Sequence, residues 1–236
     1  MAKVFPSGPT GNHLLNLLPP ADLARLQPRL QPVDLASSQV VYEARGPIEF
    51  VYFPLNCVLS AVTVMSDGHA IEVATMGNEG LSGLATFASG ATSPHRVFAQ
   101  IAGDALRVDA ELFNRECAAL PGLGKTMTNY QQAFLFQISQ SVACNGLHVI
   151  VERCCRWLLI THDRVDTDDV TLTHEFLSIM LGVRRSSVTE VLQSLQKQEL
   201  IRYTQGRITI TNRPGLEELA CECYRAVRDE YDRLLS

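Results

Sequence analysis

The segment 172–210 constrains the fold of this chain most, because it predicts two short helices, a tight turn and a hairpin in immediate succession. Apolar residues recur there at helical spacing in two runs. The first run begins at Thr173, whose hydroxyl can cap a helix, and the second begins at about Arg184. Gly182 lies between the runs and supplies the turn. The arrangement predicts a helix-turn-helix.

Two strand-like runs follow the second helix. Residues 201–204 and 207–210 alternate apolar and polar side chains, and Gln205-Gly206 between them is a turn signal. A hairpin at this place is typical of the wing of a winged helix-turn-helix, whose second helix lies in the major groove of DNA. An ordinary helical hairpin packed on a small sheet is the alternative interpretation.

The charge of this segment favours a nucleic-acid partner. The whole chain has a net charge of −5, but residues 182–213 contain six Lys or Arg and two acidic residues. Cations and hydrogen-bonding side chains at a helix start are what reading of base edges needs. The expected base contacts are Arg185, Ser186, Thr189 and Glu190. The expected phosphate contacts are Thr173, Arg184, Ser187, Arg202, Tyr203 and Arg207.

These residues resemble a known DNA-binding domain. The runs LTHEFL at 172–177, LGVRRSSVT at 181–189 and LI at 200–201 resemble the C-terminal winged helix of the Crp/Fnr family of bacterial transcription regulators. The resemblance implies a cytoplasmic homodimer that binds double-stranded DNA and regulates transcription, with RNA polymerase as a further candidate partner. It departs from the expected pattern at Arg184, where a capping Ser or Thr is usual, so the second helix is open to a shift of one residue.

The first 110 residues predict a β-rich domain. Strand-like runs separated by Gly and Pro favour an antiparallel barrel or double-sheet roll, and Asp67-Gly68 is a strong hairpin turn. The predicted strands are 40–42, 50–54, 58–65, 70–75, 96–101 and 105–108. This domain resembles the cyclic-nucleotide-binding-like domain of the same family.

The resemblance allows the sequence to be compared with the residues that bind cyclic AMP in other family members. Family members that bind it surround the phosphate with a Gly-Glu-Leu turn and an Arg followed by two small residues. Here Leu84 stands where Glu would hold the ribose, and Val97 follows Arg96. We therefore expect no classical gating by cyclic AMP; another ligand, or a glycine-rich loop without a ligand, remain equal alternatives. The expected effector pocket comprises Gly80, Leu81, Ser82, Gly83, Leu84, Arg96 and Val97.

A long helix is predicted from about Leu123 to Val149, where proline is absent and apolar residues fall at a spacing of three or four. At 1.5 Å per residue such a helix is about 38 Å long. We expect it to pair with the same helix of a second subunit; a helix lying along its own barrel is the alternative. The expected dimer helix residues are Met127, Tyr130, Phe134, Ile138 and Val142.

The predicted fold class is therefore α+β. It comprises an N-terminal antiparallel β-roll resembling a cyclic-nucleotide-binding jelly roll, a long dimerisation helix and a C-terminal winged helix-turn-helix. The expected boundaries are 1–120 for the sensor roll, 121–150 for the dimerisation helix and hinge, and 151–236 for the DNA-binding domain. No apolar run reaches the roughly 20 residues that span a bilayer, and the N-terminus does not resemble a signal peptide.

The cysteines and histidines predict neither a cofactor nor a metal. Seven Cys are scattered without a CxxC motif, which favours a reducing compartment over a disulfide framework. Only Cys57 precedes residue 100, so the N-terminal cluster of iron–sulfur family members is absent. Cys154-Cys155 is either redox-active or a pair of small buried residues. The final segment, which opens with Pro214, is predicted to be helical, and Cys221 and Cys223 lie on different faces of it, which argues against a metal pair.

Two other classes of function remain as alternatives to DNA binding. A ligand-binding regulatory module without DNA function would bind a nucleotide or another small molecule, but the pocket departs from the nucleotide pattern. An enzyme is the second alternative, and the sequence has no catalytic triad order, metal motif or phosphate-binding loop in a credible context.

Overall fold

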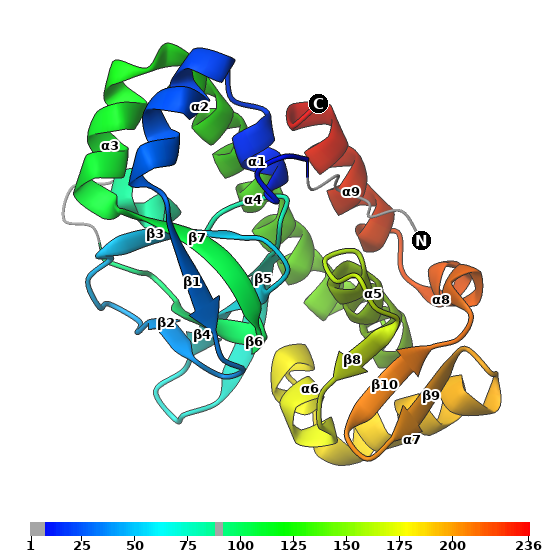
Figure 1. The fold of residues 1–236 in the computed structure, drawn as a ribbon. Coiled ribbons are helices and arrows are strands. Elements are labelled where there is room, and N and C mark those ends of the chain that lie inside the picture. Colours follow the sequence, from blue (N-terminus) through cyan, green and yellow to red (C-terminus); the bar gives the residue numbers. More distant parts are fainter. Residues whose placement is uncertain (1–7, 88–91) are drawn as a thin grey trace.

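The computed structural model describes residues 8–87 and 92–236, which form two lobes connected by a long helix (Figure 1). The N-terminal lobe contains two antiparallel sheets, and the C-terminal lobe contains a small three-stranded sheet and several helices. Among the described residues, no helix is long and apolar enough to cross a membrane. The predicted α+β class is confirmed.

All six strands predicted in the first 110 residues are present. One sheet has the order β1-β7-β3 and the other the order β2-β6-β4-β5, with every pair antiparallel. The strands are β1 (Gln31–Leu35), β2 (Val40–Tyr42), β3 (Phe50–Pro54), β4 (Val58–Val64), β5 (Ala70–Met76), β6 (Arg96–Ile101) and β7 (Gly103–Asp109). The sequence analysis missed β1, because only Leu35 of this strand is buried and the alternation is weak.

Short helices close one end of the roll. They are α1 (His13–Asn16), α2 (Pro20–Leu26), the 3₁₀ helices at Gln27–Arg29 and Leu84–Phe87, and α3 (Ala110–Ala119). The Leu112 N–H donates to the Asp109 carboxylate at 2.8 Å, so Asp109 caps α3 as its position predicts. Phe113 of α3 packs edge-on against Phe53 of β3, which anchors α3 in the core.

The long helix α4 (Pro121–Leu147) has 27 residues, which corresponds to about 40 Å. One stripe of it is buried inside its own subunit, against β5 and the C-terminal helix α9 (Cys223–Leu234). Met127 and Tyr130 belong to that stripe and are at most 3% exposed. The expectation that these two residues face a second subunit is therefore wrong, because the N-terminal lobe and α9 already cover them.

The C-terminal lobe has the predicted helix-turn-helix and wing. Its elements are α5 (Ile150–His162), β8 (Asp169–Thr171), α6 (His174–Leu181), α7 (Arg185–Lys197), β9 (Ile201–Thr204), β10 (Arg207–Ile210) and α8 (Arg213–Leu219). The wing sheet has the order β8-β10-β9. Strand β8 was not predicted, because it is three residues long in an acidic, polar segment.

The C-terminal helix α9 returns to the N-terminal lobe (Figure 1). Val227, Tyr231 and Leu235 join the same buried cluster as the roll and α4. Tyr231 donates a hydrogen bond to Gln137 of α4 at 3.0 Å. The last helix therefore packs in the core of the first lobe, although we expected it within the DNA-binding domain.

Candidate nucleic-acid interface and effector cavity

The first helix of the motif is held by a cap at each end. The Phe176 N–H donates to the Thr173 hydroxyl at 3.1 Å. At the other end, Gly182 adopts the left-handed conformation, with φ 63° and ψ 42°. Thr173 is therefore exposed but engaged with its own helix, and Gly182 makes the tight turn that sets the direction of α7.

The second helix, α7, presents a polar face to solvent. Its apolar side packs into the lobe through Val188, Val191, Leu192 and Leu195. Arg185, Ser186 and Glu190 are exposed on the other side. Arg184 occupies the capping position without making a side-chain cap, so the helix begins at Arg185, one residue later than the sequence suggests.

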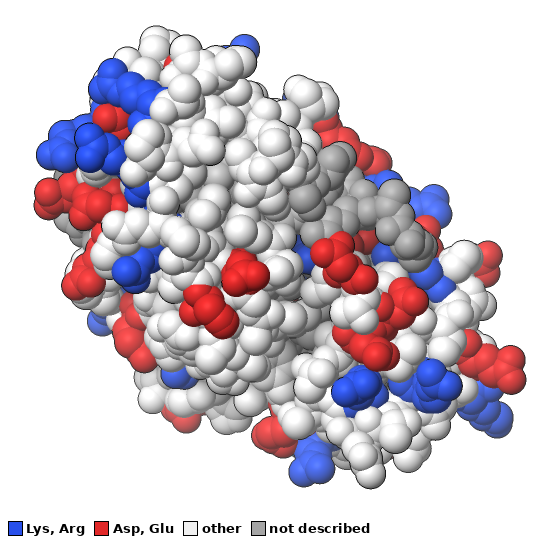
Figure 2. All heavy atoms as spheres, in the orientation of Figure 1, with Lys and Arg blue, Asp and Glu red and all other residues white. Residues whose placement is uncertain are grey.

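Basic side chains accompany α7 on the surface of the lobe. Figure 2 shows Lys and Arg gathered along the lower edge of this lobe, over the wing and α7. Arg202 of β9 and Arg207 of β10 are exposed, and the Arg207 guanidinium lies 3.6 Å from the Asp169 carboxylate. The expected phosphate-binding Arg residues thus lie on the surface next to the exposed face of α7.

His174 joins the two helices and the wing, which the sequence analysis missed. Its Nδ1 lies 2.8 Å from the Thr189 hydroxyl of α7, and its ring centroid lies 4.5 Å from that of Tyr203 in the wing. Burial and the charge of Arg185 lower the pKa of His174, which favours the neutral ring. Thr189 and Tyr203 are both half-buried by these contacts. The signal in the sequence was a His directly after the helix cap.

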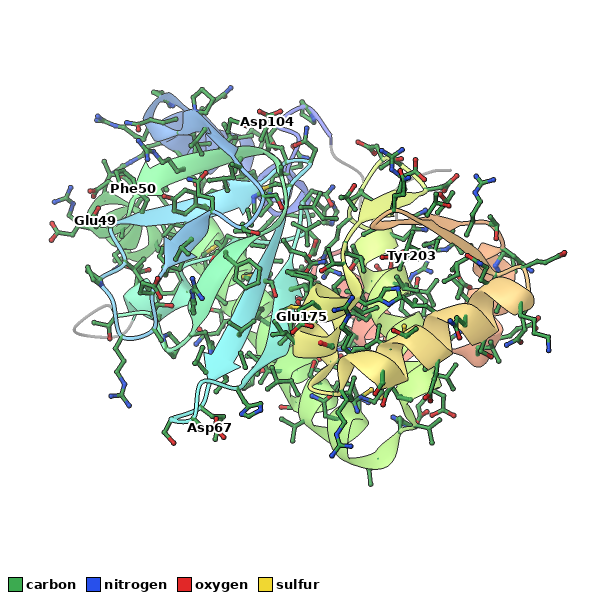
Figure 3. All side chains as sticks on the ribbon, turned by 90° about the horizontal axis from the view of Figure 1, so that it is seen from below. Glu49, Phe50, Asp67, Asp104, Glu175 and Tyr203 are labelled. Atoms are coloured by element: carbon green, nitrogen blue, oxygen red, sulfur yellow. The ribbon has the colours of Figure 1, made fainter. Side chains whose placement is uncertain are left out.

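The motif packs against the N-terminal sheets. Phe176 of α6 meets Phe98 of β6 edge-on, and Trp157 of α5 donates to Glu72 of β5 at 2.8 Å. Figure 3 shows Glu175 on α6 near the N-terminal sheet and Asp67 at the tip of the β4–β5 hairpin. A groove of about 970 Å³ between hairpin and motif is lined by Asp67, His69, Arg96, Glu175, Arg184 and Arg185, among others.

Glu72 makes this contact between the lobes sensitive to pH. Burial raises the pKa of Glu72 to about 7, although hydrogen bonds and nearby Arg156 oppose the shift. Between pH 4.5 and about 7, the Glu72 carboxyl therefore holds a proton in the folded protein, whereas in the unfolded chain, with a Glu pKa of 4.5, it has lost that proton. Stability contributed by this group falls as the pH rises from 4.5 to about 7.

Glu72→Gln should remove that loss of stability. The wild type loses stability between pH 5 and pH 8, and the variant lacks this loss. The difference in free energy of unfolding, variant minus wild type, should therefore grow by about 1–3 kcal/mol over that range, since each pKa unit corresponds to about 1.4 kcal/mol. Urea unfolding at both pH values measures the difference. Glu111→Gln, at an exposed position, is the matched control, and an equal pH response in both variants would contradict the assignment.

Five of the seven residues expected to form the effector pocket line a small cavity of about 150 Å³ between the second sheet and α4. Leu81, Ser82, Gly83, Leu84 and Val97 line it, as expected. Its other described lining residues are Tyr42, Ile48, Ala61, Met76, Ala85, Ser93, Pro94, His95, Phe134 and Ile138. Ligand pockets usually measure about 300 Å³ or more, so this cavity is smaller than a typical site for a small molecule.

Two residues of the expected pocket lie elsewhere. Because neighbouring side chains of a strand point to opposite faces, Val97 points inward and Arg96 outward, where Arg96 pairs with Glu43 at 3.4 Å. A side chain at Gly80 would meet the Tyr130 ring at 2.3 Å, so this glycine is needed for close packing. Arg96 and Gly80 therefore do not line this cavity, and none of its described lining residues is Lys or Arg.

The glycine-rich loop 77–83 holds a side chain of the C-terminal lobe. Arg164, after α5, donates to the Glu79 carboxylate at 3.0 and 2.7 Å and to the Ile160 carbonyl at 2.7 Å. A Cβ at Gly77 would lie 2.5 Å from the Arg164 side chain. The loop therefore receives a protein guanidinium where we considered a ligand.

Comparisons with known proteins agree with this architecture. The family description "Crp-like helix-turn-helix domain" matches residues 152–219. Among curated proteins, no relative matches the sequence.

Solved structures of regulators have the same fold. FixK2 from Bradyrhizobium japonicum is 18% identical, with a TM-score of 0.70 over 81% of this chain and 98% of that one. Two regulators from Thermus thermophilus are similar. TTHB099 of the CRP family has 18% identity and a TM-score of 0.67 over 80% and 96% of the two chains. TTHA1359 of the CRP/FNR family has 19% identity and a TM-score of 0.61 over 80% and 98%.

These identities support the shared fold alone, and the family description covers residues 152–219 alone. The shared fold extends over the two-sheet roll, the long helix and the C-terminal lobe, because about 80% of this chain is covered in each comparison. Residues 152–219 thus match a Crp-like helix-turn-helix domain, and they lie in a chain that has the fold of solved CRP and CRP/FNR transcriptional regulators.

Proposed function

We propose that this regulator binds a two-fold symmetric DNA site as a homodimer and does so without cyclic AMP. The exposed start of α7, beside the basic wing, is the observation that supports DNA reading most directly. Arg185 contacts a guanine edge through two hydrogen bonds, while Ser186, Thr189 and Glu190 reach neighbouring bases. Thr173, Arg184, Ser187, Arg202, Tyr203 and Arg207 contact phosphates and set the register.

The long helix supports a dimer through its exposed face. Leu135 and Val142 lie seven residues apart on α4 and are 58% and 67% exposed. This heptad spacing, with half-buried Ile138 between them, is typical of a seam between two helices. The proposed seam is therefore Leu135, Ile138 and Val142, next to Phe134, because Met127 and Tyr130 are occupied inside the subunit.

The cavity supports independence from cyclic AMP. Its described lining offers no cation for the phosphate, and its volume is about 150 Å³. A regulatory module that binds nucleotides without a DNA function is thereby disfavoured. The polar groups of the cavity are few, among them Ser82, Ser93 and half-buried His95.

Selection from a random DNA pool tests the proposal. The ligand-free protein, at near-physiological salt, should recover a palindrome whose half-sites are about 34 Å apart. Adding cyclic AMP should leave the affinity for that palindrome unchanged. Recovery of a palindrome only with cyclic AMP would contradict the proposed independence, and recovery of nothing in either case would contradict DNA binding by the purified protein.

Two single substitutions test the roles of base and phosphate contacts. Arg185→Ala should cost about 1–3 kcal/mol on the selected site and relax the preference at one base position. Arg207→Ala should weaken selected and random DNA alike and reduce the salt dependence of binding. Titrations on both DNAs measure this, and equal losses on both for Arg185→Ala would show that Arg185 does not read a base.

A further inference from the structure

Four side chains with metal-binding atoms converge where α4 ends. Cys144 lies in the last turn of α4, and His148 is the residue that follows the helix. Cys221 lies in the connection between α8 and α9, and Cys223 is the first residue of α9. The three Sγ atoms and one imidazole nitrogen all lie within 4.8 Å of one another, and the three Cys are buried. It is the one such group among the described residues.

The break between α8 and α9 explains why the sequence analysis did not expect this cluster. On one continuous helix, Cys221 and Cys223 would point to different faces. The structure instead ends α8 at Leu219 and starts α9 at Cys223, so Cys221 lies in the connection. Both sulfur atoms then face Cys144, which lies 77 residues away from Cys221 in the chain.

We propose that Cys144, His148, Cys221 and Cys223 bind one zinc ion. Tetrahedral zinc with bonds of about 2.3 Å to sulfur and about 2.0 Å to nitrogen places its ligands roughly 3.5–3.8 Å apart. The Cys144 and Cys221 sulfurs are 3.5 Å apart, and the Cys223 sulfur is 3.5 Å from His148 Nδ1. A sulfur separation of 3.5 Å also exceeds the roughly 2.05 Å of a disulfide.

Neighbouring groups orient the ligands as in known zinc sites. With Nδ1 facing the metal, His148 Nε2 is free to pair with the Glu222 carboxylate, which lies 3.2 Å away. Gln140 of α4 donates its side-chain N–H to the Cys223 sulfur at 3.2 Å. A carboxylate on the second imidazole nitrogen fixes the ring and makes the coordinating nitrogen more basic.

The charge of the occupied site is balanced locally. Three thiolates, a neutral imidazole and Zn²⁺ carry a net charge of −1, and the thiol protons leave to solvent on binding. Arg156 and Arg153 interact electrostatically with Cys144, and both are less than 10% exposed. Four protein ligands leave no open position, which makes this a structural site rather than a catalytic one.

The zinc ion links the end of α4 to the connection between α8 and α9, in addition to the hydrogen bonds from Gln140 to Cys223 and from Tyr231 to Gln137. His148 lies between α4 and α5, the start of the DNA-binding lobe, while Cys221 and Cys223 lie between α8 and α9. The metal therefore fixes the direction in which the C-terminal lobe leaves the long helix. An effect of zinc on DNA affinity rests on the proposed function, whereas zinc binding itself does not.

Metal analysis of the full-length protein, reconstituted with zinc under reducing conditions, tests the site. We expect one zinc per chain in the wild type and less than about 0.1 in the Cys221→Ser/Cys223→Ser double variant. Cys117→Ser, at a half-buried cysteine outside the cluster, is the control and should retain one zinc. Cobalt in place of zinc should give thiolate charge-transfer and tetrahedral d–d absorption in the wild type and in Cys117→Ser alone.

A second variant distinguishes loss of zinc binding from a folding defect in the double variant. Glu222→Gln alters an exposed side chain and should weaken zinc affinity about 10- to 100-fold, as loss of such a partner does elsewhere, with the fold retained. Equal zinc content in the wild type and the double variant would overturn the site. So would a wild type that binds only iron, or one in which Cys144 and Cys221 form a disulfide under reductant. DNA affinity is measured separately, so a failure of DNA binding leaves the zinc result intact.

Discussion

Replacing Glu79 with Ala should lower the free energy of unfolding by about 3–5 kcal/mol, because it leaves the Arg164 guanidinium buried without its counter-charge. The Arg164 side chain is 4% exposed and that of Glu79 is fully buried. The pair joins the loop after β5 to the end of α5, so it also holds the two lobes together. Urea unfolding of wild type and variant measures the effect.

Two controls distinguish the cost of an unpaired buried charge from other effects of substitution on stability. Glu79→Leu combined with Arg164→Met removes both charges and should recover most of the loss, since apolar replacement of a buried pair is often neutral. Glu230→Ala breaks the surface pair with Arg233, whose side chain is 62% exposed, and should leave stability essentially unchanged. A Glu79→Ala protein as stable as the wild type would show that Arg164 finds other partners.

Replacing Val142 with Asp should dissociate the homodimer. In the proposed two-fold seam the substitution places two carboxylates, one from each subunit, on a surface that association buries. A buried charge without a partner costs several kcal/mol, so we expect the dimer dissociation constant to rise about 10³-fold or more. Sedimentation equilibrium over a range of concentrations measures this constant, and affinity for the two-fold DNA site should fall with it.

Val64→Asp is the matched control for that experiment. Val64 ends β4 and is 45% exposed, so the same chemical change is made on the surface of the roll and away from α4. Its dissociation constant should remain that of the wild type. A Val142→Asp protein that stays dimeric at the same concentrations would place the interface elsewhere.

Local patterns predicted the elements of this protein well. Alternation located β2 to β7 except for their ends, and the cap at Thr173 with Gly182 located the helix-turn-helix. These signals are local because capping, turn conformation and the strand period of two depend on residues that are near in the chain. Strands β1 and β8 were not predicted, because short strands with few buried residues show little alternation of apolar and polar side chains.

Face assignments were less certain than the elements themselves. The apolar stripe on α4 was predicted to face a second subunit, but its first members, Met127 and Tyr130, pack inside the subunit. When a helix has apolar residues on two faces, its sequence does not show which neighbouring element or subunit covers each face. The return of α9 onto α4 decides this, and no residue near α4 in the chain signals it.

The sequence by itself determined the fold class, because the helix-turn-helix, its wing and the strands of the β-roll each depend on residues that are close together in the chain. Only the tertiary structure decided which side chains that are distant in the sequence come into contact. It buried Arg164 against Glu79, 85 residues away, and turned Arg96 out of the expected pocket. It also brought Cys144 and His148 to Cys221 and Cys223 across a helix break. Such contacts depend on how whole elements pack, and spacing along the chain does not encode that packing.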